Sequence, residues 1–220
     1  MNLGKLVNLY ISDGYEQADA IAKVAQDIVL LKISNSVLNR NVTIKGGVVI
    51  HSISNDKRRA TRDMDFDFIK YSLDDDSIKS FIKKLNNAND EIKIDINGTI
   101  EKLHHQDYDG KRINITIIDN NNYRIDSKLD IGVHKDFDIE QEEYCFNLDI
   151  INKSATLLIN SPEQIFVEKL KSLLKFVYTS TRYKDIFDFY YLITNCNLNK
   201  NKIIDIILNY IQSFESITVP

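Results

Sequence analysis

A double glycine between a short β-branched segment and a strictly alternating acidic segment constrains this chain most. The β-branched segment covers residues 42–45 and ends directly at Gly46-Gly47, where the backbone is free to turn and to approach a ligand closely. Sixteen residues after Gly47, the stretch 63–68 reads Asp-Met-Asp-Phe-Asp-Phe. This period of two predicts a strand with three aspartates on one face and Met64 with two phenylalanines on the other.

The segments before and after these two strands predict a mixed protein. Apolar residues recur at helical spacing from Asn2 to about Asn39, with a break near Asp13-Gly14, so two helices are expected there. Val48 is expected to begin a third helix and Asp74 a fourth. Ser161 is expected to cap a later helix that starts at Pro162. Strands are predicted over 91–96, 99–105, 112–118, 123–133 and 144–150, with turns at Asn97-Gly98, Asp109-Gly110 and Asn120–Asn122, and helices over 162–178, 183–194 and 200–213.

Composition excludes several classes of protein. The 220 residues carry 28 Lys and Arg against 32 Asp and Glu, so the net charge of −4 argues against non-specific coating of nucleic acid. No apolar run is long enough to cross a bilayer, and the first 20 residues contain Asp13, Glu16 and Asp19 instead of a basic start and an apolar stretch, which indicates a cytoplasmic protein. Cys145 and Cys196 are too few for a disulfide framework or a zinc site, and we expect buried thiols.

Charge is unevenly distributed around the double glycine. Residues 40–62 carry a basic block, and residues 63–76 carry an acidic block directly after it. Local charge is therefore more informative than the small net charge.

The acidic pattern also suggests chemistry. Asp63 and Asp65 share a strand face and can bind one hard cation through oxygen ligands, for which magnesium is suited. Gly46 and Gly47 can present N–H groups to phosphate. Asp-x-Asp alone is more often a solvated strand face, but Asp130 on a later predicted strand offers a third carboxylate. Such an arrangement can hold a nucleoside triphosphate for in-line attack.

Four motifs, in order, resemble the AbiEii/AbiGii nucleotidyltransferase toxin family. They are Lys45-Gly46-Gly47, Arg59–Phe66 (RATRDMDF), Leu129-Asp130-Ile131, and Ser161–Gln164 leading through Glu168-Lys169-Leu170 to Arg182–Tyr190. The resemblance implies an α+β fold of the DNA polymerase β-like nucleotidyltransferase type, with a mixed sheet flanked by helices. It divides the chain into a core with N-terminal helices over 1–160 and a C-terminal helical part, packed on that core, over 161–220. Many members are toxins of type IV toxin–antitoxin or abortive-infection systems, and some transfer nucleotides to tRNA acceptor ends.

The same resemblance implies roles for individual residues. Asp63, Asp65 and Asp130 would bind Mg²⁺, and Asp130 would also orient or activate the attacking hydroxyl. Lys169 would act with them by neutralising phosphate charge. The residues implied to bind the nucleoside triphosphate are Gly46, Gly47, Arg59, Thr61, Lys184, Asp185 and Asp188, with Arg182 as a further contact to nucleotide or RNA.

Several alternatives stay open. Lys169 on an amphipathic helix is by default solvated, and Asp185 and Asp188 can pair with Lys184 or Arg182. The family usually has Thr or Ser where this chain has Val48, which removes one phosphate contact. Because of Val48, a catalytically degenerate fold that binds nucleotide or RNA is one alternative to an active enzyme.

The expected acceptor of an active enzyme is a tRNA 3′ end, and a small molecule or a protein side chain is the alternative. A cognate antitoxin is an expected partner, although it need not bind.

Overall fold

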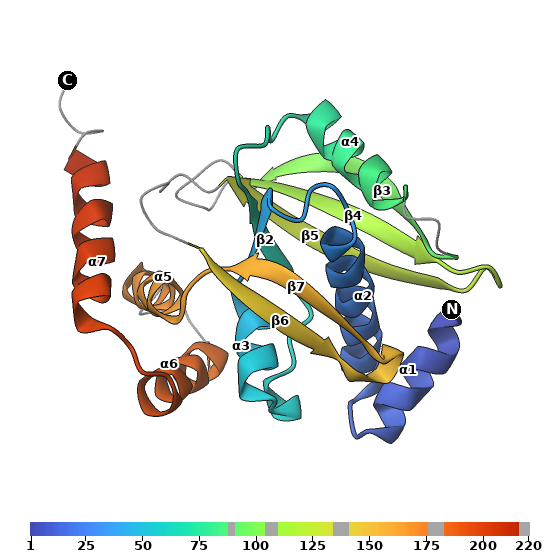
Figure 1. The fold of residues 1–220 in the computed structure, drawn as a ribbon, viewed down its shortest axis with the longest axis horizontal. Coiled ribbons are helices and arrows are strands. Elements are labelled where there is room, and N and C mark those ends of the chain that lie inside the picture. Colours follow the sequence, from blue (N-terminus) through green and yellow to red (C-terminus); the bar gives the residue numbers. More distant parts are fainter. Residues whose placement is uncertain (88–90, 104–109, 134–140, 176–182, 216–220) are drawn as a thin grey trace. The chain divides into compact units, whose positions relative to one another are not determined.

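Seven strands form one mixed sheet (Figure 1). The computed structural model describes residues 1–87, 91–103, 110–133, 141–175 and 183–215. The strand order is β3-β4-β5-β2-β1-β7-β6, and both parallel and antiparallel neighbours occur in it. The predicted α+β class and the mixed sheet are therefore confirmed.

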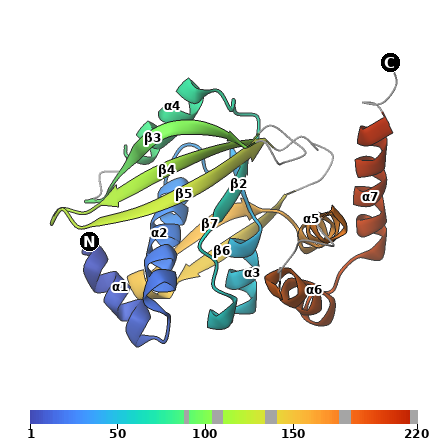
Figure 2. The same cartoon turned by 180° about the vertical axis from the view of Figure 1, so that it is seen from behind.

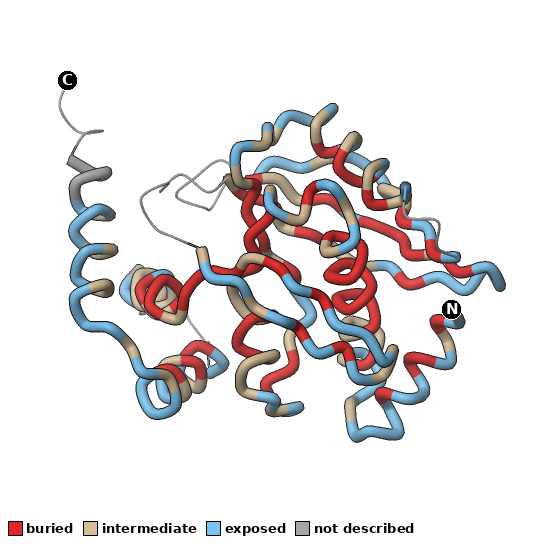
Figure 3. The backbone as a smooth tube through the Cα atoms, in the orientation of Figure 1, coloured by how far each residue is buried: buried red, intermediate tan, exposed pale blue. Residues whose placement is uncertain are grey.

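Two helices precede the sheet, as predicted from the apolar spacing. They are α1 (Leu3–Ser12) and α2 (Gln17–Ser34). The side chain of Asn2 caps α1 by accepting from the Lys5 N–H, and Asp119 accepts from the Leu3 N–H at 2.9 Å. The second half of α2 is almost wholly buried, so it forms a central part of the core (Figure 3).

The two strands flanking the double glycine lie side by side in the middle of the sheet. β1 (Val42–Lys45) pairs antiparallel with β2 (Met64–Phe68). The apolar face of β2 packs on α4 (Asp75–Leu85), because the Phe81 ring lies 5.7 and 5.0 Å from the rings of Phe66 and Phe68. In Figures 1 and 2, α2 and α4 cover the same face of β3, β4 and β5. The predicted separation of aspartates from apolar residues along β2 is confirmed.

Three long strands form one side of the sheet. They are β3 (Lys93–Leu103), β4 (Gly110–Ile118) and β5 (Arg124–Val133). β3 is one strand where two were predicted, so the expected turn at Asn97-Gly98 is wrong. Gly98 has φ +84°, and the pairing with β4 shifts register between Asn97 and Glu101. A glycine with positive φ serves a bulge as well as a turn, and only the pairing distinguishes the two.

The other edge of the sheet is a hairpin that was only half predicted. β6 (Glu142–Leu148) runs through a single turn of 3₁₀ helix, Asp149–Ile151, into β7 (Lys153–Ile159). The last predicted strand ends at residue 150, so β7 is not predicted by the sequence. β7 pairs in parallel with β1. Cys145 on the edge strand β6 is exposed and Cys196 is half-buried, so the expectation of buried thiols is wrong.

Three helices follow the sheet. They are α5 (Pro162–Lys175), α6 (Tyr183–Asn195) and α7 (Lys200–Glu215). The predicted start of α5 is confirmed, since Ser161 and Gln164 cap each other's backbone N–H groups in a capping box. By its internal contacts the chain forms two compact units, one with all seven strands and α1 to α4, the other with α5 to α7. The assignment of domains at 160/161 remains a prediction.

None of the helices in the described parts of the chain has the length and apolarity required to span a bilayer.

Candidate functional site

The double glycine forms a tight corner between β1 and α3 (Gly47–Ser54). Gly46 has φ +66° and ψ −139°, a conformation that side chains disfavour, and a Cβ there would lie 3.1 Å from Oδ2 of Asp65. A Cβ on Gly47 would lie 2.7 Å from Oγ1 of Thr61. Both glycines are therefore required, because Asp65 and Thr61 approach the backbone closely at this corner.

The start of α3 faces this corner with backbone groups alone. The first N–H groups of a helix have no acceptor within the helix, and no side chain caps α3. Together with the helix dipole, these donors favour an anion at this end. Val48 is only 4% exposed, so its side chain packs in the core of this unit.

Two of the three singled-out carboxylates are direct neighbours across two strands. β2 and β5 pair in parallel, and their register places Asp65 opposite Asp130. Residues directly opposite each other project from the same face of a sheet. Asp63 precedes β2 by one residue, and its side chain is 56% exposed. The structure thus brings Asp65, Asp130, Gly46 and, through Gly47, Thr61 to one region of the sheet unit.

Basic side chains hold these carboxylates. Arg112 on β4 donates from Nε and Nη2 to the two oxygens of Asp130, at 2.7 Å each. This pairing raises the pKa of Arg112, chiefly through the hydrogen bonds to Asp130. Nζ of Lys128 lies 2.7 Å from Oδ1 of Asp63. Within the described residues, no three His, Cys, Asp or Glu side chains are gathered closely enough to hold a metal ion as they stand.

The basic side chains of residues 40–62 pair with carboxylates, most of which lie outside this block. Lys45 pairs with the buried Asp67 at 3.0 Å. The other ion pairs are Arg40 with Glu143, Lys57 with Asp13, Arg58 with Asp56, and Arg62 with Asp19. Charge that is plain in the sequence is therefore largely compensated in the structure.

Arg59 is buried, and the segment that follows it is bonded to α2. Arg59 lies in a short 3₁₀ turn and is 4% exposed. Gln26 of α2 donates from Nε2 to the Thr61 carbonyl at 2.8 Å. His51 of α3 has Nε2 3.1 Å from the hydroxyl of Tyr15. Burial, followed by the positive charges of Lys23 and Arg59, lowers the pKa of His51 to about 4.

The remaining motif residues lie in the helical unit. Nζ of Lys169 on α5 is 2.6 Å from Oδ1 of Asp185 and 2.7 Å from Oδ2 of Asp188, both on α6. All three side chains are at most 14% exposed. Both aspartates thus pair with Lys169. Lys184 lies at the exposed start of α6. Arg182 lies outside the described residues.

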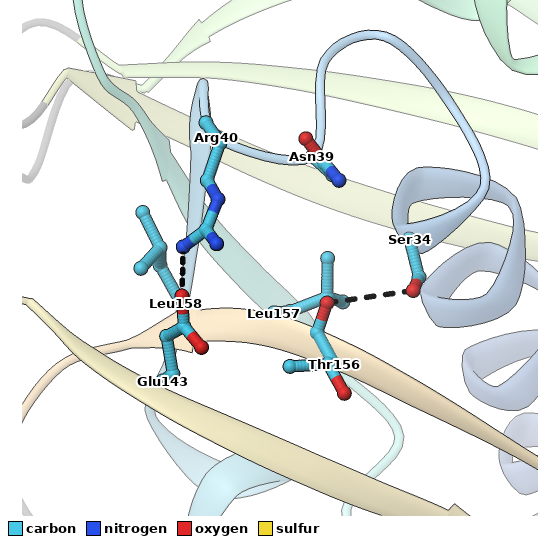
Figure 4. Close-up of a pocket in the computed structure, with 7 residues that line it drawn as sticks. All are labelled: Ser34, Asn39, Arg40, Glu143, Thr156, Leu157 and Leu158. Atoms are coloured by element: carbon cyan, nitrogen blue, oxygen red, sulfur yellow. Dashed lines mark hydrogen bonds and ion pairs between the residues drawn. The ribbon is translucent and has the colours of Figure 1, made fainter.

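A small hollow in the sheet unit contains none of these groups. It measures about 180 Å³ and lies between α2, β6 and β7. Figure 4 shows Arg40 facing Glu143 and the Ser34 hydroxyl facing the Thr156 carbonyl. No carboxylate of the Asp65 region lines it, so the hollow is separate from the candidate site.

Sequence reasoning missed Arg112 and the pairing role of Lys128. A signal for Arg112 existed, since Asn121 is the centre of a predicted turn, and residues nine positions before and after it are Arg112 and Asp130. In the structure β4 and β5 pair in that register. The parallel pairing of β2 with β5 has no such local signal.

Comparison with known proteins gives one family match. The family model described as "Nucleotidyl transferase AbiEii toxin, Type IV TA system" matches residues 28–216. A search of curated proteins found no match. Among solved structures, a crystal structure of an antigenic nucleotidyltransferase-like protein from Paracoccidioides brasiliensis is similar, with 16% identity, a TM-score of 0.49 and 90% of each chain covered.

Proposed function

The chain belongs to the AbiEii family of nucleotidyltransferase toxins, and from that premise we propose that it transfers a nucleoside monophosphate from an NTP to the 3′ hydroxyl of tRNA, with magnesium as the metal. One observation carries the proposal: Asp65 and Asp130 lie opposite each other on adjacent strands, beside the Gly46 corner and the start of α3.

The donor set fits a hard divalent cation. Asp63, Asp65 and Asp130 offer only carboxylate oxygens, which Mg²⁺ prefers. The space at Gly46 supports this fit, because a Cβ there would lie 3.1 Å from Oδ2 of Asp65. These three aspartates would hold the ions. When bound, the metal supplies charge neutralisation at the triphosphate and at the attacking oxygen.

The protein's own groups would then have distinct tasks. The backbone N–H groups at the start of α3 bind triphosphate oxygens. Asp130 accepts the proton of the acceptor hydroxyl. The hydroxyl oxygen forms a bond to the α-phosphorus, the bond from that phosphorus to the oxygen bridging to the β-phosphate breaks, and pyrophosphate leaves with the electron pair.

Three further residues support this site through their positions. Thr61 lies against Gly47 and holds the corner in shape. Arg59 is buried close to His51, so we propose that it acts on the triphosphate only over a distance or after a local shift. Lys169, held by Asp185 and Asp188, is proposed to organise the helical unit, and Lys184 at the exposed start of α6 is proposed to contact the nucleotide.

The alternative of a catalytically degenerate fold depends on Val48. A Ser or Thr hydroxyl is missing at this position. The Val48 side chain packs in the core, and the donors of the cradle are backbone groups that any residue supplies. We therefore favour an active enzyme.

The test is incubation of the full chain with Mg²⁺, each α-labelled NTP in turn and total tRNA. Label in the RNA band is expected with one NTP. Asp65→Asn is expected to abolish it, while Asp126→Asn, a same-strand neighbour of Asp130 that pairs with Thr116, retains it. Label that persists in Asp65→Asn contradicts the proposal. Label on an added aminoglycoside or on protein, with none on RNA, moves the acceptor to those classes.

A further inference from the structure

Four charged residues lie in one row across four neighbouring strands. Lys45 on β1 is opposite Asp65 on β2, Asp65 is opposite Asp130 on β5, and Asp130 is opposite Arg112 on β4. Directly opposed residues share a face of the sheet. The row therefore has a cation at each end and two carboxylates in the middle.

The cation of Arg112 occupies both oxygens of Asp130. Nε and Nη2 each lie 2.7 Å from a different carboxylate oxygen, which is the bidentate geometry of a guanidinium fork. Asp63 lies one position before β2, and its Oδ1 is 2.7 Å from Nζ of Lys128 on β5. Asp130 and Asp63, both proposed as metal ligands, thus carry a protein cation.

These two ion pairs lie where solvent reaches them. In the first pair the side chain of Arg112 is 35% exposed and that of Asp130 is 12% exposed; in the second pair Lys128 is 41% exposed and Asp63 is 56% exposed. Because solvent reaches the cation of each pair, that cation can leave into water and a divalent cation can replace it on the carboxylate. By contrast, the Lys45–Asp67 pair is only 10% and 8% exposed and is not expected to exchange.

A released guanidinium has a suitable destination at the same site. An NTP is strongly anionic, and the planar fork of Arg112 matches two phosphate oxygens as it matches a carboxylate. The long side chain of Lys128 can follow a phosphate as a flexible point charge.

We propose that Arg112 and Lys128 are exchangeable stand-in cations: they neutralise Asp130 and Asp63 in the metal-free protein and move to substrate phosphates when divalent metal takes the carboxylates. This inference rests on the proposed function. It assigns Arg112 as a phosphate-binding residue and makes metal and nucleotide binding mutually reinforcing, because each relieves the competition that opposes the other.

The experiment measures equilibrium binding of Mn²⁺ to the full chain without nucleotide, from the electron paramagnetic resonance signal of free Mn²⁺. Removing a competing cation is expected to tighten binding, so Arg112→Gln and Lys128→Gln each lower the Kd about three- to tenfold. Arg112→Lys, which keeps the charge and loses the fork, is expected to fall between Arg112→Gln and wild type.

The matched control is Lys111→Gln. Lys111 neighbours Arg112 on β4 but pairs with Asp75 of α4. Its substitution by Gln removes the same positive charge as Arg112→Gln. Its Kd for Mn²⁺ is expected to stay within about twofold of wild type. Thermal melting of each variant reports whether it is folded, and Lys128→Gln tests the exchange independently of Arg112.

The outcomes separate this inference from the function on which it rests. Unchanged or weaker Mn²⁺ binding in folded Arg112→Gln and Lys128→Gln, with wild-type binding intact, overturns the exchange alone. Absence of Mn²⁺ binding in every variant overturns the magnesium site as well. Tighter binding in both variants, together with a raised KM for NTP in Arg112→Gln, supports the exchange.

Discussion

Aspartates meet basic side chains in both units of the molecule, and burial separates the two cases. In the sheet unit, Arg112 is 35% exposed and its partner Asp130 is 12% exposed. In the helical unit, Lys169 is 14% exposed and its partner Asp188 is fully buried. The cost of an unpaired charge rises steeply with burial. The comparison teaches that the first pair is exchangeable and suits binding, whereas the second holds α5 and α6 together.

The largest expected effect sharpens the functional side of this comparison. Asp65→Asn is expected to reduce nucleotidyl transfer roughly a thousandfold, because it removes a metal ligand while keeping the shape of the side chain. Its urea midpoint should stay near that of wild type. Initial rates of pyrophosphate release measure the loss. A rate within tenfold of wild type would remove Asp65 from the site.

The next effect tests the structural side. Asp188→Asn leaves Lys169 with one carboxylate in a buried place and is expected to lower the free energy of unfolding by about 3 kcal/mol. Urea titration of the full chain gives the value, and hydrogen exchange should show lost protection in α5 and α6. Asp130→Asn is the control, with a smaller expected loss, because the Arg112 that it leaves unpaired is 35% exposed. Equal losses in the two variants would erase the distinction.

An intermediate effect distinguishes the units by pH. Burial lowers the pKa of His51 to about 4, from 6.5 in an unfolded chain. The folded protein therefore binds this proton less than the unfolded protein does. The preference of the fold for neutral His51 costs no stability above pH 6.5, where the unfolded chain is also neutral. Stability is lost as the pH falls from 6.5 towards 4, because only the unfolded chain binds the proton in that range. Between pH 7.5 and 4.5 wild type should lose about 2 kcal/mol more than His51→Gln.

The helical unit should respond at lower pH. Burial opposes ionisation of Glu163, but the backbone N–H of Asn199 and the charge of Lys202 lower its pKa overall. The stability that Glu163 provides is present above about pH 4.5 and is lost as the pH falls below that value. Hydrogen exchange over a pH series should therefore show α3 opening first. The same pH response in wild type and His51→Gln would contradict the assignment to His51.

The smallest effect concerns the exchangeable pair itself. Arg112→Gln is expected to change the free energy of unfolding by less than about 1 kcal/mol, since the pair is partly solvated and screened. Urea titration at low and at high salt checks this. A loss near that of Asp188→Asn would mean that Arg112 is structural, and the comparison between the two units would fail.

The sequence by itself determined the local features of this protein. Alternation in residues 63–68 defined β2 and its two faces, and the double glycine located the corner before α3. Ser161 and Pro162 marked the start of α5. Each of these depends on contacts between residues close in the chain, where period, capping and backbone freedom are visible in the letters.

Only the tertiary structure decided which distant groups meet. Parallel pairing of β2 with β5 placed Asp65 opposite Asp130, and ion pairs with distant carboxylates compensated charges of the basic block. The packing of α5 on α6 placed Lys169 against two aspartates. The physical reason is that parallel register, desolvation and charge compensation are set by the packing of segments far apart in the sequence.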